Sequence, residues 1–190
     1  MTRRYDLKRR AAKQAETRRR IVAATVSLHT TEGPARTTIS AIADRAGVER
    51  HTVYAHFPDE ASLFGACSAH WRELHPFPAG MRWRATTDPT RRLGAALNDV
   101  YAWYERVGDD IEVFNRDAAV HELTSVLSAR REEALSEIRE AVLPGLPRRK
   151  AVRAAVGHAL AFETWRSLVR REGLTRTQAV DAMLSFVASV

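Results

Sequence analysis

The sequence predicts an all-α protein of about nine helices. No segment alternates apolar and polar residues for long enough to favour a β-strand, and apolar residues recur instead at spacings of three and four. Glycines and prolines stand where helices of ordinary length would end. With 190 residues, of which 45% are hydrophobic, the chain is long enough for one large core or two smaller ones.

Four helices are expected in the first 74 residues. They are predicted at about residues 11–29, 38–46, 50–56 and 59–74. The first has an inward stripe made of Ile21, Ala24, Thr25 and Leu28, and Gly33-Pro34 ends it. Gly47 separates the second helix from the third.

The remaining helices follow a proline-rich break. Pro76, Pro78 and Gly80 interrupt the chain before Asp88-Pro89, a cap followed by a proline at the first helical position. Five helices are predicted after this loop, at about residues 89–108, 110–118, 121–142, 148–172 and 175–190. The last begins with a Thr175/Gln178 capping box.

The net charge is confined to the first third of the chain. Residues 1–57 hold 12 lysines and arginines and five acidic residues, whereas residues 58–190 hold 18 of each sign. A basic block beside a neutral remainder is typical of a polyanion-binding domain joined to a second part. We therefore expect an N-terminal domain at 1–57 and a C-terminal domain at 58–190, connected by the helix at about 59–74.

Composition argues against several other classes of protein. No apolar run is long enough for a membrane span, and no signal peptide is evident, so a cytoplasmic, nucleoid-associated protein is expected. Cys67 is the only cysteine, which excludes an internal disulfide and a cysteine-based zinc site. It is either a small buried residue or a redox sensor. No metal site, cofactor or catalytic motif is predicted, and the protein is not expected to be an enzyme.

Ala43, Gly47 and Val53 form the skeleton of a helix-turn-helix. Ala43 is small where two helices cross, Gly47 permits the positive φ of a tight turn, and Val53 faces inward from the second helix. Docked in the major groove, this helix offers Arg50 to a guanine and His51 or Thr52 to neighbouring bases. Side chains suited to phosphate oxygens are Thr38, Tyr54 and His56.

The wider string TTISAIADRAGVERHTVYAHFPDEASLFGAC resembles the N-terminal domain of the TetR family of bacterial repressors. The resemblance is specific over residues 37–63, notably Ile42-Ala43, Ala46-Gly47-Val48 and Thr52-Val53-Tyr54 followed by His56-Phe57-Pro58. It continues loosely to FETWRSLVRREGLT, which is similar to the junction of the family's last two helices. The resemblance implies an Ω-shaped homodimeric repressor that binds a palindromic operator and is released by a small-molecule effector.

Three residues depart from the family pattern. Glu49 stands where a serine usually caps the recognition helix, His51 where a glycine is common, and Glu60 where a lysine often contacts phosphate. Glu49 either accepts from a cytosine amine or is a solvated carboxylate. The operator sequence therefore does not follow from relatives.

The basic N-terminal arm has two interpretations. Its charges lie at Arg3-Arg4, Lys8-Arg9-Arg10 and Arg18-Arg19-Arg20. It folds along DNA or into the minor groove, or it is a disordered, solvated tail.

Two further sites are suggested by the resemblance, each with core packing as the competing interpretation. An effector pocket is expected to use mostly aromatic side chains, namely Trp71, Tyr101, Tyr104, Phe114, His121 and Trp165. A dimer interface is expected on two apolar stripes of the last helices, at Val152, Ala155, Ala159, Phe162, Val180, Met183, Leu184 and Val187. The alternatives to a ligand-released repressor are a DNA-binding regulator or architectural protein without a ligand, and a small helical enzyme.

Overall fold

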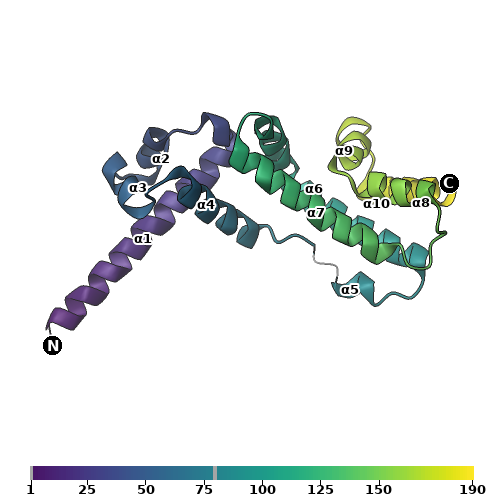
Figure 1. The fold of residues 1–190 in the computed structure, drawn as a ribbon, viewed down its shortest axis with the longest axis horizontal. Coiled ribbons are helices and arrows are strands. Elements are labelled where there is room, and N and C mark those ends of the chain that lie inside the picture. Colours follow the sequence, from purple (N-terminus) through teal and green to yellow (C-terminus); the bar gives the residue numbers. More distant parts are fainter. Residues whose placement is uncertain (1, 79–80) are drawn as a thin grey trace. The chain divides into compact units, whose positions relative to one another are not determined.

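The computed structural model describes residues 2–78 and 81–190, and these residues contain helices and no strand. The elements are α1 (Thr2–Thr31), η1 (Pro34–Arg36), α2 (Ile39–Ala46), α3 (Arg50–His56), α4 (Glu60–Leu74), α5 (Met81–Arg84), α6 (Pro89–Ala118), α7 (Glu122–Val142), α8 (Lys150–Leu160), α9 (Phe162–Trp165), η2 (Arg166–Arg171) and α10 (Arg176–Ala188) (Figure 1). The all-α prediction is confirmed. Within the described ranges, no helix combines the length and apolarity needed to cross a bilayer.

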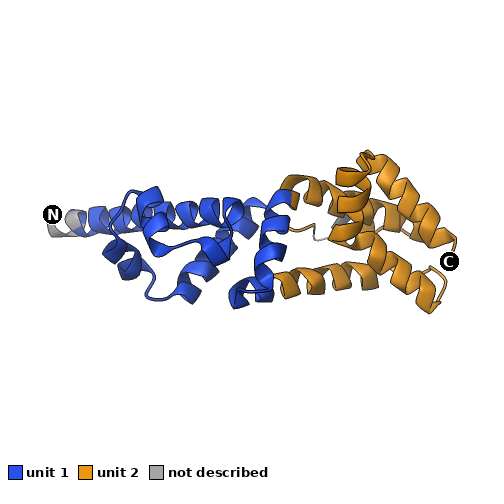
Figure 2. Cartoon of the chain, turned by 90° about the horizontal axis from the view of Figure 1, so that it is seen from above, with its two compact units in different colours: residues 1–76, 109–126 blue, residues 77–108, 127–190 orange. Residues whose placement is uncertain are grey.

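The chain forms two compact units, coloured in Figure 2. Unit 1 consists of residues 1–76 and 109–126, and unit 2 consists of residues 77–108 and 127–190. The division differs from the predicted boundary between residues 57 and 58, because α4 packs against α1 and stays with unit 1. The second half of α6 also belongs to unit 1, so this helix contributes residues to both units.

The core of unit 1 is built on the predicted stripe of α1. Ile21 and Thr25 are fully buried, and Ala24 and Leu28 are nearly so. These residues recur at three- and four-residue spacing, so they lie on one face of the helix. That face packs against α2 and α4, which fixes the position of the helix-turn-helix.

Helix α1 begins at Thr2, well before the expected start at about residue 11. The arm is rich in Arg, Lys and Ala, which favour helix. The structure therefore has a helix in the arm, and not the disordered tail of the alternative interpretation.

Gly108 does not end a helix, and α6 replaces two predicted helices. A Cβ at Gly108 would lie 2.7 Å from Cη2 of Trp165, so the absence of a side chain lets the indole approach the helix. The glycine serves packing here and not termination.

The predicted helix at 148–172 is broken at Ala161, whose backbone is extended. The α9 segment and the π-helical η2 follow the break. Tyr101 Oη donates to the carbonyl of Ala159 at 2.8 Å, and Tyr104 Oη donates to that of Leu160 at 2.9 Å. Because carbonyls at a helix end lose their intrahelical partners, these two hydroxyls from α6 stabilise an end that the local sequence does not indicate.

Candidate nucleic-acid interface

The turn of the helix-turn-helix is formed as predicted. Gly47 ends α2 with φ +62°, and its N–H donates to the carbonyls of Ala43 and Asp44. The N–H of Val48 also donates to Ala43, at 3.0 Å. This left-handed cap reverses the chain in one residue and favours glycine.

Helix α3 has one buried face and one exposed face. Val53 is fully buried, and Ala43 and Phe57 are nearly so. Of the residues predicted to contact DNA, Thr38, Arg50, His51 and Tyr54 are exposed, and Thr52 and His56 are half-buried. The fold therefore presents all six at or near the surface of unit 1. The hydroxyl of Thr38 also caps α2, accepting from the N–H of Ala41 at 3.2 Å.

Two arginines of α1 hold the segments that flank α3. The guanidinium of Arg20 donates to the carbonyls of Ala46 and, at 2.9 Å, Gly47, in the turn before α3. Arg18 donates to the carbonyl of His56 at 2.9 Å, and its guanidinium lies 4.0 Å from the centre of the Phe57 ring. Sequence reasoning assigned both only to the basic arm. No sequence signal distinguishes them, because their acceptors are backbone carbonyls.

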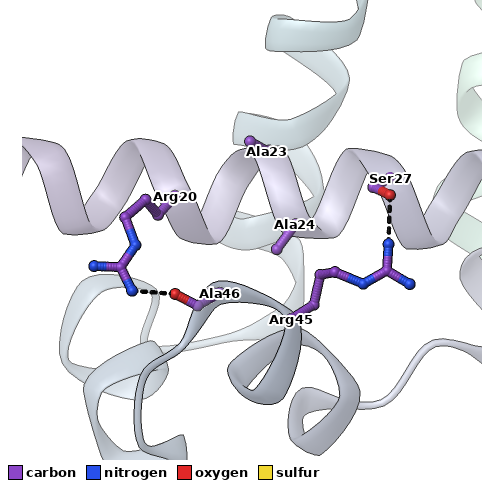
Figure 3. A pocket seen from close by; sticks show the side chains of 6 residues that line it. All are labelled: Arg20, Ala23, Ala24, Ser27, Arg45 and Ala46. Atoms are coloured by element: carbon purple, nitrogen blue, oxygen red, sulfur yellow. Dashed lines mark hydrogen bonds between the residues drawn. The ribbon is translucent and has the colours of Figure 1, made fainter.

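A shallow pocket of about 280 Å³ lies between α1 and α2, lined by Arg20, Ala23, Ala24, Ser27, Arg45 and Ala46. Figure 3 shows the two hydrogen bonds at its sides, from Arg20 to the carbonyl of Ala46 and from Arg45 to the hydroxyl of Ser27. The second bond is 2.7 Å long. Both bonds cross from one helix to the other, so they fix the packing of α2 on α1.

Two of the departures from the family pattern have structural counterparts. Glu49 occupies the N-cap of α3, but its side chain makes no capping hydrogen bond. Glu60 Oε1 lies 3.0 Å from Nε2 of His121. His121 was predicted for the effector pocket, but it lies in unit 1 and pairs with the residue that replaces a phosphate-binding lysine.

The end of α6 is anchored to the loop before α2. Asp117 accepts from the backbone N–H of Ala35 at 2.9 Å and from Arg116 Nε at 2.8 Å. Burial opposes ionisation of Asp117, but these hydrogen bonds and the charges of Arg116 and Arg36 together outweigh it and lower the pKa of the carboxyl. Gly33, with φ +101°, has no room for a side chain, since a Cβ there would overlap the Asp117 carboxylate.

A second contact ties α6 to α4. The indole N–H of Trp71 donates to Asp110 Oδ2 at 2.7 Å, and the Trp71 and Phe114 rings meet edge to face at 5.6 Å. Burial raises the pKa of Asp110, and the Trp71 bond opposes that shift. Trp71 and Phe114, both predicted for the effector pocket, are thus in contact within unit 1.

A histidine of α1 and a cysteine of α4 are in contact inside unit 1. Cys67 Sγ lies 3.4 Å from Nδ1 of His29, where α4 packs on α1. Burial lowers the pKa of His29 to about 4 and raises the pKa of Cys67 to about 11. Both groups are therefore neutral at pH 7.

The other three predicted pocket residues lie in unit 2. Tyr101, Tyr104 and Trp165 are almost completely buried, and the Tyr104 and Trp165 rings are 5.6 Å apart. Burial raises the pKa of both tyrosines, so their hydroxyls stay protonated. The indole N–H of Trp165 is buried without a hydrogen-bond partner within the described part of the chain.

The predicted dimer residues are mostly core of unit 2. Six of them are buried within the single chain, namely Val152, Ala155, Ala159, Phe162, Val180 and Val187. The apolar stripes of α8 and α10 pack against each other, which leaves these six little surface for a partner. Met183 and Leu184 remain half-buried, and Phe186, which was not predicted, is 40% exposed.

Residues 21–67 match the family described as "Bacterial regulatory proteins, tetR family". No curated protein matches the chain.

Solved structures share the fold over most of the chain. A TetR-like transcriptional regulator from Rhodococcus sp. RHA1 is 18% identical with a TM-score of 0.64, covering 90% of this chain and 93% of its own. A TetR transcription regulator from Haloarcula marismortui is 18% identical with a TM-score of 0.60, covering 92% and 96%. AibR, solved with isovaleryl coenzyme A and operator DNA, is 20% identical with a TM-score of 0.61, covering 90% and 97%.

Proposed function

We propose that this chain, whose residues 21–67 match the TetR family model, is a transcriptional repressor released from DNA by a small-molecule effector. The observation that carries the proposal is the outer face of α3. Arg50, His51 and Tyr54 are exposed there, and Arg50 has no hydrogen bond or ion pair with any residue that the structure describes. The inner face and the flanking segments are held in place.

The exposed face suits the major groove of DNA. That groove is about 12 Å wide and admits a helix, and an arginine at the start of the helix makes a bidentate contact with guanine. Arg50 is the first residue of α3. We assign it to guanine recognition, His51 and Thr52 to adjacent bases, and Thr38, Tyr54 and His56 to phosphates.

We propose that the repressor is a homodimer on a palindromic operator. Each recognition helix would enter one of two major grooves about 34–36 Å apart. The candidate contact surface is the part of α10 that the monomer leaves accessible, at Met183, Leu184 and Phe186. These three residues take the place of the six buried residues that the sequence predicted for the dimer interface.

We propose that the effector binds in unit 2 beside Trp165. A buried N–H without an acceptor costs about 1–3 kcal/mol, and an acceptor on a ligand would recover that cost. Support for a ligand comes from AibR, which has this fold and was solved with both an acyl-coenzyme A and operator DNA.

Helix α6 provides the connection between effector and DNA in this proposal. Tyr101 and Tyr104 in its first half belong to unit 2, and Asp110 and Asp117 in its second half hold α4 and the loop before α2. A shift of α6 caused by the effector would act on the DNA-binding helices through these two carboxylates. The effector can weaken DNA binding only as far as it binds the DNA-free state of the protein more tightly than the DNA-bound state.

Selection of bound sequences from random double-stranded DNA tests the proposal. The full chain should enrich an inverted repeat whose half-site centres lie about 10 base pairs, or a multiple of this, apart. Enrichment of no sequence, together with a steep salt dependence, would indicate an architectural DNA-binding protein instead.

The effector is tested by native mass spectrometry of the purified chain and by adding any molecule that co-purifies. That molecule should release the selected DNA from the wild-type protein, and Trp165→Phe should need more of it while binding DNA equally well. Chemical conversion of the molecule by the protein would contradict a purely regulatory role.

A further inference from the structure

The net charge of the protein lies on the segment before the helix-turn-helix. Residues 2–20 contain nine lysines and arginines and two acidic residues, a net charge of +7 that equals that of the whole chain. Residues 21–57, which include the recognition helix, hold three residues of each sign. Long-range attraction to a polyanion therefore comes from the segment that precedes the domain, because net charge governs that attraction.

This segment is the first part of α1, and it is solvent-exposed. Every side chain from residue 7 to residue 16 is exposed, and Figure 1 shows this part of α1 extending beyond α2, α3 and α4. Before the contacts of Arg18 and Arg20, the interactions described for this part of the helix stay within α1, between Arg9 and Tyr5 and between Glu16 and Arg19. For the described side chains of residues 7–16, no hydrogen bond or ion pair with α2, α3 or α4 explains why the helix continues so far.

The arm carries positive charge on several sides. Successive residues of a helix are about 100° apart around its axis, so Lys8, Arg9 and Arg10 point in three directions. The apolar side chains described here, Tyr5, Leu7 and three alanines, are all exposed to solvent. The arm suits a surface that presents phosphates along and around the helix, as duplex DNA does.

The arm starts beside the recognition helix. At its root, Arg18 is bonded to His56, the last residue of α3, and Arg20 is bonded to Gly47 in the turn just before α3. When α3 occupies a major groove, the arm must therefore leave from the edge of that groove.

We propose that residues 2–16 form a helical DNA-binding arm that contacts the phosphates flanking each half-site. The inference rests on the proposed function and extends it. A helix with its side chains is about 10–12 Å across, which matches the major groove but exceeds the minor groove of about 6 Å. The helical arm thus lies along the backbone or in the wide groove, and not in the minor groove.

The length of the arm sets the size of the added contact. Fifteen helical residues span about 22 Å, equivalent to about six base pairs at 3.4 Å each. Each half-site should accordingly be protected for about six base pairs more than α3 alone requires.

DNA binding also removes a cost of the free arm. A helix without tertiary packing is only marginally stable in water, and like charges four residues apart, such as Arg9 and Lys13, repel each other. Bound phosphates neutralise these charges, so DNA stabilises the helix.

The test uses the full chain and a variant with Lys8, Arg9, Arg10 and Lys13 changed to glutamine, which retains helix propensity and length. The DNA is the duplex recovered by selection, either ending at the half-sites or extended by twelve base pairs on each side. With extended DNA, the variant should lower the slope of log affinity against log salt by about 2–4 and shorten the hydroxyl-radical footprint at both outer edges. With the short duplex, the two proteins should differ much less.

A matched control removes the same charge elsewhere. Arg130, Arg148, Lys150 and Arg171 are exposed residues of unit 2, and changing these four to glutamine alters the net charge equally. The control should keep the wild-type slope and footprint.

Equal effects of the two quadruple variants, or an unchanged footprint in the arm variant, would overturn the arm proposal alone. Failure of the wild-type chain to bind any duplex would overturn the proposed function itself.

Discussion

The carboxylate of Asp117, at the end of α6, accepts a 2.9 Å hydrogen bond from the backbone N–H of Ala35, 82 positions earlier in the chain. The bond joins the helix that continues into unit 2 to the loop that precedes the helix-turn-helix. Asp117 is 3% exposed, so water does not readily replace its partner.

Replacement of Asp117 by alanine should lower the free energy of unfolding by about 1.5–3 kcal/mol at pH 7, since hydrogen bonds to buried charged groups have that value. Urea denaturation measures it, and Asp117→Asn should lose less because it keeps an acceptor. The folded-state pKa of Asp117 is lowered, so the contribution is present above the unfolded pKa near 3.9 and is lost as pH falls through the lower folded value. An alanine variant as stable as wild type at pH 7 would contradict this role.

Arg50→Ala should cost about 1–3 kcal/mol of DNA-binding free energy and relax the preference at one base step. The measurement is affinity for the selected duplex and for its single-base variants. Tyr54→Phe is the comparison: it removes a hydroxyl assigned to phosphate and should weaken all sequences about equally. If Arg50→Ala also weakens all sequences equally, its contact is with phosphate.

Acidification should destabilise the protein through His29. Burial lowers its folded pKa to about 4, below the unfolded value near 6.5. Above pH 6.5, His29 is neutral in both states and does not lower the free energy of unfolding. Between pH 6.5 and 4 only the unfolded state binds the proton, so the free energy of unfolding falls progressively as pH falls. Cys67 contacts His29, and the titratable groups that face it are His121, Glu60 and Asp117.

Urea denaturation at pH 7 and pH 5 measures this effect. Wild type should lose about 1–2 kcal/mol more than His29→Gln over that interval. Parallel losses in the two proteins would assign the acid sensitivity to other groups.

Two glycines should respond in opposite directions to alanine. Gly65 lies in α4, and a Cβ at this position would have no neighbour within 4 Å, so Gly65→Ala should raise the free energy of unfolding by about 0.5–1 kcal/mol. Gly47→Ala should lower it by about 1–2 kcal/mol, because φ is +62° and a Cβ would lie 3.0 Å from Arg20 Nη2. Gly173→Ala is the control for backbone strain alone, since φ is +71° with no neighbour within 4 Å.

Cys67 should react slowly in the folded protein. Burial raises the pKa of its thiol to about 11, and the thiolate is the reactive form. Alkylation by iodoacetamide at pH 8 should be slower than in urea-unfolded protein by on the order of a hundredfold. Comparable rates in the two states would revive the hypothesis of a redox sensor.

The sequence by itself determined the features that depend on near neighbours. The stripe of α1, the turn at Gly47, the inward position of Val53 and the Thr175/Gln178 capping box all arise from residues within a few positions of one another. Helical periodicity and turn chemistry act at that range. For the same reason, the exposed face of α3 could be predicted together with its buried one.

Only the tertiary structure decided the features whose partners are distant in sequence. Gly108 lies inside α6 because Trp165 packs over it, and the break at Ala161 is stabilised by the hydroxyls of Tyr101 and Tyr104. In the sequence, Arg18 and Arg20 do not differ from other basic residues. In the structure, both donate hydrogen bonds to backbone carbonyls of the helix-turn-helix. A glycine, hydroxyl or guanidinium takes its role from the groups around it, and only the folded chain brings those groups together.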